Sequence, residues 1–163
     1  FTAPNRMVAA VLNDVGTEEL AHLEIVSTIV HQLTKDLSME EIENSGLGPY
    51  YIDHTVGIWP QSAGGVPFNA CEFQSKGDPI TDLFEDMAAE QKARSTYDNI
   101  LRLCKDYPDV YEPIKFLRER EVAHFQRFGE SLGIVRDKMD TKNFYAFNSA
   151  FDTSAPCVEK CGK

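Results

Sequence analysis

The chain has 163 residues, of which 42% are hydrophobic and 26% are charged, a composition that predicts one globular domain rather than a disordered chain. Its 16 basic and 26 acidic side chains give a net charge of −10, which argues against binding to nucleic acid or to an anionic membrane. No apolar run is long enough to cross a bilayer. The four cysteines form no CxxC pair, which favours a reducing, intracellular protein over a disulfide scaffold; they are Cys71, Cys104, Cys157 and Cys161.

Three segments have apolar residues at alternating spacings of three and four, which predicts one buried face on each of three long helices. These segments are residues 4–35, 79–105 and 108–139. At 1.5 Å per residue each helix would be roughly 40–50 Å long, and such lengths in a small protein predict a helical bundle. A short helix is expected at about residues 38–44, and the short link at residues 106–109 predicts an antiparallel hairpin.

The remaining segments differ from flexible linkers in their aromatic content. Residues 46–78 are rich in Gly and Pro but include Trp59 and Phe68, so we expect an ordered crossover that packs along the bundle. Residues 140–163 carry several aromatic residues without a helical period, which predicts an extended arm that packs on its own bundle or on a neighbouring subunit. We therefore predict a helical bundle domain at residues 1–139, followed by this C-terminal arm.

Each apolar face is interrupted by ionisable residues near the middle of its helix. The first helix has Glu19 and His22, the third has Glu121 and His124, and the second has Glu90. In a Glu-x-x-His motif both side chains share one helix face. A carboxylate buried in a bundle is costly unless it is paired or bound to a cation, so two such motifs and a third glutamate predict a carboxylate-bridged site for two metal ions. The alternative is a buried hydrogen-bonded network of Glu, Arg and His side chains without metal.

Other polar residues near these motifs are not expected to be metal ligands. His31 lacks a glutamate three residues before it and His54 lies in the crossover, so neither is expected to bind metal. Glu18 is expected at the rim of the site rather than among the ligands. Arg94 and Tyr97 lie one and two turns beyond the glutamate of the second helix, where they either orient ligands or stabilise helix packing.

The segments that carry these motifs resemble the manganese catalases and, within them, the spore-coat-associated branch. The resembling segments are GTEELAHLE at 16–24, AGGVPF at 63–68, KGDPI at 76–80, AAEQKAR at 88–94 and REREVAH at 118–124. The resemblance implies an all-α, ferritin-like four-helix bundle that converts hydrogen peroxide to water and dioxygen at two manganese ions. It also implies a homo-oligomer, hexameric in the family, and a location in the spore coat with other coat proteins as partners.

The resemblance also assigns roles to individual residues. Glu19 would bridge both manganese ions, His22 would bind the first, and Glu90 and His124 would bind the second. Glu121 corresponds to an outer-sphere glutamate that shuttles protons, although related di-iron bundles use this position as a bridging ligand. A di-iron oxidase or peroxidase is therefore one alternative, and a structural spore-coat protein with a vestigial metal site is another.

The number of helices departs from the family pattern. The family bundle has four long helices, the first of which supplies another glutamate ligand, whereas this sequence predicts three. A bundle of three helices would leave one side of a charged core open to water. We therefore expect a further helix, roughly thirty residues long, to be supplied by a preceding segment or by another chain.

Overall fold

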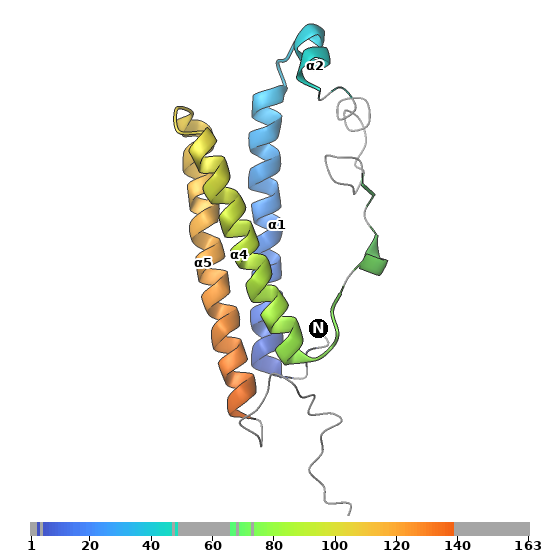
Figure 1. Cartoon of the computed structure of the whole chain (residues 1–163), viewed down its shortest axis with the longest axis vertical. Helices are drawn as coiled ribbons and strands as arrows, with labels where there is room; N and C mark the ends of the chain where they lie inside the picture. Colours follow the sequence, from blue (N-terminus) through green and yellow to red (C-terminus); the bar gives the residue numbers. More distant parts are fainter. Residues whose placement is uncertain are drawn as a thin grey trace, which may run out of the picture. The chain divides into compact units, whose positions relative to one another are not determined.

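A computed structural model of the chain describes residues 3, 5–46, 48, 66–67, 69–72 and 74–138. The regular elements of this part are helical (Figure 1): α1 (Arg6–Thr34), α2 (Met39–Ser45), the 3₁₀ helix η1 (Ala70–Glu72), α4 (Pro79–Leu103) and α5 (Pro108–Asp137). The predicted all-α fold class is confirmed, and the three long helices begin and end within about two residues of the predicted bounds. The C-terminal arm, with Cys157 and Cys161, and most of the crossover lie outside the described residues, so those expectations stay predictions.

The chain divides into two compact units, and the boundary falls within helix α1. The first unit comprises residues 1–21 and 75–163, and the second comprises residues 22–74. The first unit therefore contains the beginning of α1 together with α4 and α5, whereas the second contains the rest of α1 with α2 and η1.

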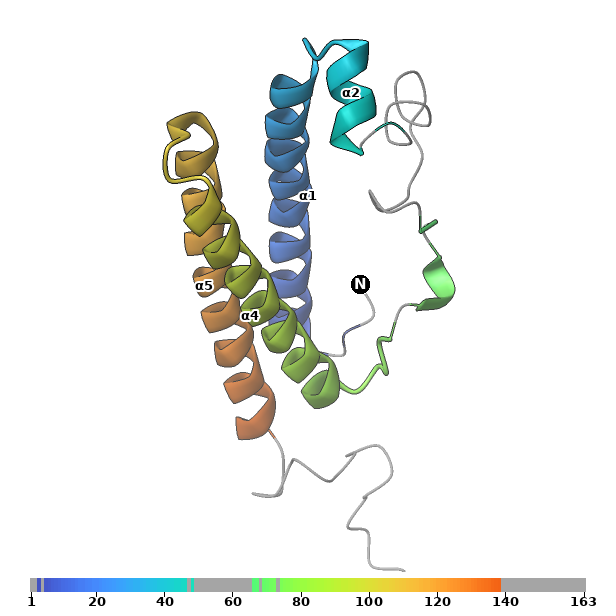
Figure 2. The ribbon, with the colours of Figure 1, turned by 45° about the horizontal axis from the view of Figure 1, so that its top comes forward.

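Helices α4 and α5 form the antiparallel hairpin predicted from their short connection (Figure 2). Helix α4 begins where the Asp78 carboxylate accepts a hydrogen bond of 2.9 Å from the backbone N–H of Thr81, and Pro79 occupies the first turn. Pro108 occupies the first turn of α5, which follows the connecting residues 104–107 and has no side-chain capping bond. Local sequence therefore fixes both helix starts, and the short link brings the two helices side by side.

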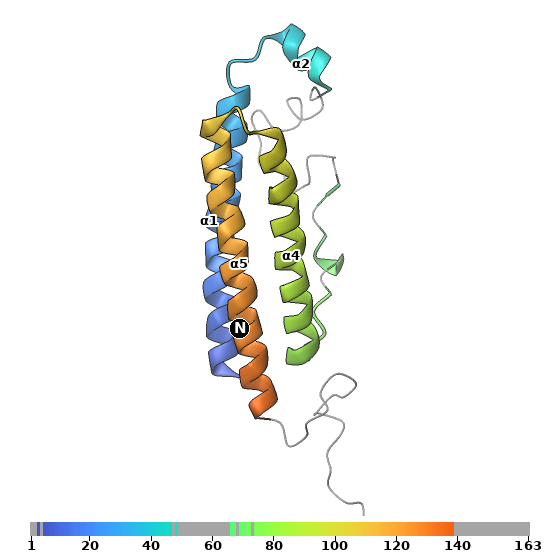
Figure 3. The ribbon, with the colours of Figure 1, turned by 60° about the vertical axis from the view of Figure 1, so that its left-hand side comes forward.

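The first unit has an apolar core to which all three of its helices contribute. Its buried members are Val8, Val15, Ile80, Leu83, Phe128, Leu132 and Val135. Fully burying one such side chain contributes roughly 1.5–3 kcal/mol, so this cluster is the main stabilising feature of the unit. Figure 3 shows α5 running in the direction opposite to α4. The first part of α1 also runs antiparallel to α5, because Asp14 contacts Arg127 and Glu18, one turn later, contacts Arg120.

The second unit contains the short helix predicted between the first long helix and the crossover. Helix α2 begins with a capping box, in which the Ser38 hydroxyl accepts from the backbone N–H of Glu41 at 3.3 Å and the Glu41 carboxylate accepts from that of Ser38 at 2.8 Å. It ends at Gly46, whose φ of 74° lies in the left-handed region that glycine adopts without strain. None of the described helices has the length and apolar character needed to span a membrane.

Candidate metal centre

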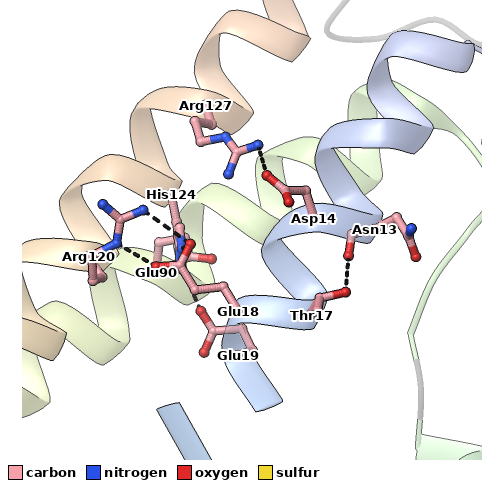
Figure 4. A network of polar contacts seen from close by, with 9 residues as sticks. All are labelled: Asn13, Asp14, Thr17, Glu18, Glu19, Glu90, Arg120, His124 and Arg127. Carbon is pink, nitrogen blue, oxygen red and sulfur yellow. Dashed lines mark hydrogen bonds and ion pairs between the residues drawn. The ribbon is translucent and has the colours of Figure 1, made fainter. Parts of the chain in front are cut away.

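One turn beyond the apolar core, the three helices of the first unit present ionisable side chains to one another. Glu18 and Glu19 come from α1, Glu90 from α4, and Glu121 and His124 from α5 (Figure 4 labels four of them). The last three are buried, with exposed fractions of 8%, 2% and 0% respectively. The helical spacing that continues the apolar faces therefore carries acidic groups into the interior, as the sequence predicts.

His124 is the residue on which the three helices converge (Figure 4). Its Nδ1 atom lies 2.8 Å from Oε1 of Glu19 and 3.6 Å from Oε2 of Glu90. Its Nε2 atom, on the other side of the ring, lies 3.0 Å from Oε2 of Glu18. Each ring nitrogen thus faces at least one carboxylate.

Four of the five residues predicted for the site form one group of candidate ligands. Glu19, Glu121 and His124 each offer a ligand atom within 4.8 Å of the others, and His22 offers a ring nitrogen to the same group. His22 does so because it follows Glu19 by three residues on one helix. The fifth residue, Glu90, is adjacent to this group through its contact with His124.

The carboxylates are crowded enough to change their ionisation. The pKa of Glu90 is raised to about 9, first because burial disfavours the charged form, then because of a hydrogen bond to Glu121 and the negative charges of Glu121 and Glu19. A divalent cation would offset this crowding. Carboxylate oxygens combined with imidazole nitrogens are ligands that suit manganese or iron, so the residues present fit a metal ion.

Glu18 lies outside the group of candidate ligands, as expected, but it makes contacts that the sequence did not predict. Its side chain is 28% exposed, but its carboxylate contacts both His124 and Arg120. The hydrogen bond from Arg120 lowers the pKa of Glu18 to about 2, against the opposing effect of burial and with a further contribution from His124. These contacts with another helix have no signal in the spacing of residues along α1.

Two other residues considered beside the site have different surroundings. The Nη1 and Nε atoms of Arg94 donate to Asp98 and Gln91 at 2.6 and 2.8 Å, and Asp98 also accepts from Nε of Arg118 at 2.9 Å. The bonds of Arg94 therefore lie within α4, and Asp98 connects them to Arg118 on α5. Tyr97 has its pKa raised, first by burial and then by the charges of the site glutamates, so it lies within their electrostatic reach.

Two other histidines, His31 and His54, are not expected to bind metal. His31 is exposed on α1 and is not among the candidate ligands found in the described residues. His54 lies outside those residues.

The chain is similar to known proteins of one family. The family model described as manganese containing catalase matches residues 1–153. The chain is 44% identical over 145 residues to Protein CotJC of Bacillus subtilis (strain 168), a match that covers 89% of this chain and 76% of that protein. It is 30% identical over 168 aligned positions to a probable manganese catalase of Clostridium acetobutylicum, with 96% of this chain and 70% of that protein covered.

A more distant match is the manganese catalase of Bacillus subtilis, which is 25% identical over 135 residues and is covered to 49% of its length. No solved structure matches the chain. The family model, which matches nearly the whole chain, and the two relatives at 30% identity or more lead to one conclusion: the chain belongs to the family of manganese containing catalases.

Proposed function

We propose that this protein is a dimanganese catalase that disproportionates hydrogen peroxide to water and dioxygen. The observation that carries the proposal is the convergence of the half-buried Glu19 with the buried His22, Glu121 and His124, with Glu90 in contact with His124, in a member of this family. Two manganese ions, when bound, supply the chemistry, because together they can take up and return the two electrons exchanged between two peroxide molecules.

Four side chains would hold the ions in this proposal, namely Glu19, His22, Glu90 and His124. Carboxylates can bridge two cations, whereas each imidazole nitrogen binds one. At neutral pH Glu90 holds a proton, because its pKa is about 9. That proton has to leave before the carboxylate can bind a cation.

Glu121 is the group we assign to proton transfer. It is only 2% exposed and lies next to Glu90, so it belongs to the buried part of the cluster. Disproportionation of peroxide requires a base that takes protons from the substrate and returns them to the product water. In this proposal Glu121 acts as the base from within the cluster.

The test measures metal content and dioxygen release of the full-length protein expressed with both manganese and iron available. We expect two manganese ions per chain and dioxygen release on addition of hydrogen peroxide. Peroxide turnover without dioxygen release in an iron-loaded protein would favour the di-iron alternative. An ordered assembly that lacks turnover even when loaded with manganese would favour a structural protein.

Glu121→Gln tests the assigned base separately from metal binding. We expect this variant to keep its manganese and to lose most of its turnover, because a general base contributes about 10²–10⁴-fold to rate. Glu119→Gln is the matched control, since Glu119 is an exposed glutamate two residues earlier on α5, and it should behave as the wild type. Unchanged dioxygen release in Glu121→Gln would remove Glu121 from this role.

We also propose that the protein forms a homo-oligomer and associates with the spore coat, which rests on the resemblance to the spore-coat-associated branch of the family. Sedimentation analysis of the purified protein tests the first statement. Fractionation of spores with an antibody to the chain tests the second.

A further inference from the structure

We propose that Glu18 is a positioning residue that holds the ring of His124 by its Nε2 atom and so leaves Nδ1 to face the metal. This inference rests on the function proposed above, because it assumes that His124 binds a cation. It assigns to Glu18 a purpose different from that of its neighbour Glu19, although both are glutamates at the same level of α1.

The two glutamates approach opposite sides of one ring. Oε2 of Glu18 lies 3.0 Å from Nε2 of His124, whereas Oε1 of Glu19 lies 2.8 Å from Nδ1. An ionised carboxylate only accepts hydrogen bonds, so the contact with Glu18 favours a hydrogen on Nε2. By the same reasoning Glu19 favours a hydrogen on Nδ1, and that hydrogen would give way to a cation bound on the side where Glu19 and Glu90 lie, whereas the one on Nε2 would stay.

Arg120 fixes the orientation of Glu18. The Nε and Nη2 atoms of Arg120 donate to the two carboxylate oxygens of Glu18, the second bond being 3.1 Å long. Such a two-point contact sets the plane of a carboxylate as well as its position. Arg120 precedes His124 by four residues on α5, so both contacts of Glu18 are made on one face of that helix.

A second ion pair between the same helices provides a matched control. Asp14, one turn before Glu18 on α1, accepts a hydrogen bond of 2.5 Å from Nη2 of Arg127 on α5. Removing Asp14 breaks a carboxylate–arginine contact between α1 and α5 without touching the ring of His124. Any effect of Glu18 on packing alone should therefore appear in both variants.

The experiment measures Mn²⁺ affinity by titration calorimetry for the wild-type full-length protein, Glu18→Ala and Asp14→Ala. We expect Glu18→Ala to bind Mn²⁺ about 10–100-fold more weakly, the usual effect of removing a group that orients a ligand. Asp14→Ala should bind Mn²⁺ as the wild type does. Equal affinity in Glu18→Ala and the wild type, or equal weakening in both variants, would overturn the proposal.

A second measurement separates this inference from the proposed function. Nitrogen-15 NMR of the metal-free protein reports which ring nitrogen of His124 carries a hydrogen. We expect Nε2 to carry one in the wild type and in Asp14→Ala, and to lose it in Glu18→Ala. A hydrogen that stays on Nε2 in Glu18→Ala contradicts the role of Glu18, whereas a wild type that binds no Mn²⁺ contradicts the proposed function.

If Glu18→Ala does not fold, as judged by its helical circular dichroism, Glu18→Gln carries the test. The glutamine keeps an acceptor for Nε2 but lacks the charge, so we expect Mn²⁺ affinity to fall several-fold. Affinity equal to that of the wild type would overturn the proposal in this case.

Discussion

The apolar core and the ionisable cluster lie on the same three helices, one turn apart, yet their energetics are opposite. Burial of Val15, Leu83 and Phe128 is favourable without any partner molecule, since it only removes apolar surface from water. Burial of Glu90 disfavours its charged form unless a cation offsets that charge, as its raised pKa shows. The apolar core therefore stabilises the fold, whereas the buried ionisable groups lower the stability of the metal-free protein and provide a site for a cation.

The largest expected effect comes from breaking the apolar region. Phe128→Ala removes a side chain that is 4% exposed, and we expect the free energy of unfolding to fall by about 3–5 kcal/mol. Urea denaturation of the metal-free protein measures this change. The control is Phe116→Ala on the same helix, where the side chain is 49% exposed and the loss should be much smaller. Equal losses in the two variants would show that the core is not where the structure places it.

A second prediction concerns the stability of the metal-free protein as a function of pH. The folded pKa of Glu90 is raised from 4.5 to about 9, so between these values the folded state holds a proton that the unfolded state lacks. The contribution of this group to stability is therefore present at low pH and is lost as pH rises, by at most about 1.4 kcal/mol per pH unit. Denaturation at a series of pH values should show that the free energy of unfolding falls more steeply with pH for the wild type than for Glu90→Gln. An equal slope in the two proteins would contradict this prediction.

Metal binding should depend on pH in the opposite direction. Because Glu90 has to release its proton to bind a cation, Mn²⁺ affinity should rise with pH until about pH 9, by up to about tenfold per unit for one proton released. Calorimetry in buffers with different ionisation enthalpies would count the protons directly. An affinity that stays constant between neutral pH and pH 9 would mean that Glu90 does not bind the ion.

The smallest effect is expected from the ion pair of Asp14 and Arg127, which belongs neither to the apolar core nor to the ionisable cluster. Asp14→Ala breaks the contact with Arg127, in which the carboxylate is 69% exposed, so the loss of stability should not exceed about 1 kcal/mol. High salt should reduce it further, because exposed charges are screened. A loss comparable to that of the core variant would show that this pair stabilises the unit more than its exposure suggests.

The helices could be predicted from the sequence because their signals are local. Asp78 followed by Pro79 predicts the start of α4, and the observed capping bond confirms it. The pairs Glu19–His22 and Glu121–His124 could be predicted as neighbours for the same reason, since the spacing of three residues acts within one helix. The observed grouping of these four residues agrees with that expectation.

The contacts between helices could not be predicted in this way. Whether Glu18 meets Arg120 and His124 depends on the register of α1 against α5, which no spacing within α1 encodes. Arg94 is a similar case, since its distance along the helix from Glu90 left open whether it turns toward the site, and in the structure it bonds to Gln91 and Asp98 of its own helix. Where a side chain can reach two partners, the position of the neighbouring helix determines which of them it contacts.

The placement of Glu18 and Glu19 on either side of one imidazole ring has a consequence for how this family can change over time. Helix α1 carries both glutamates and also Val8 and Val15 of the apolar core, so the helix fixes the direction of the glutamates relative to the two valines. Insertion or deletion of one residue between Val15 and Glu18 would turn the glutamates by about 100° relative to the valines. Length changes in this stretch should therefore be absent from active relatives, while substitutions on its outer surface remain permitted.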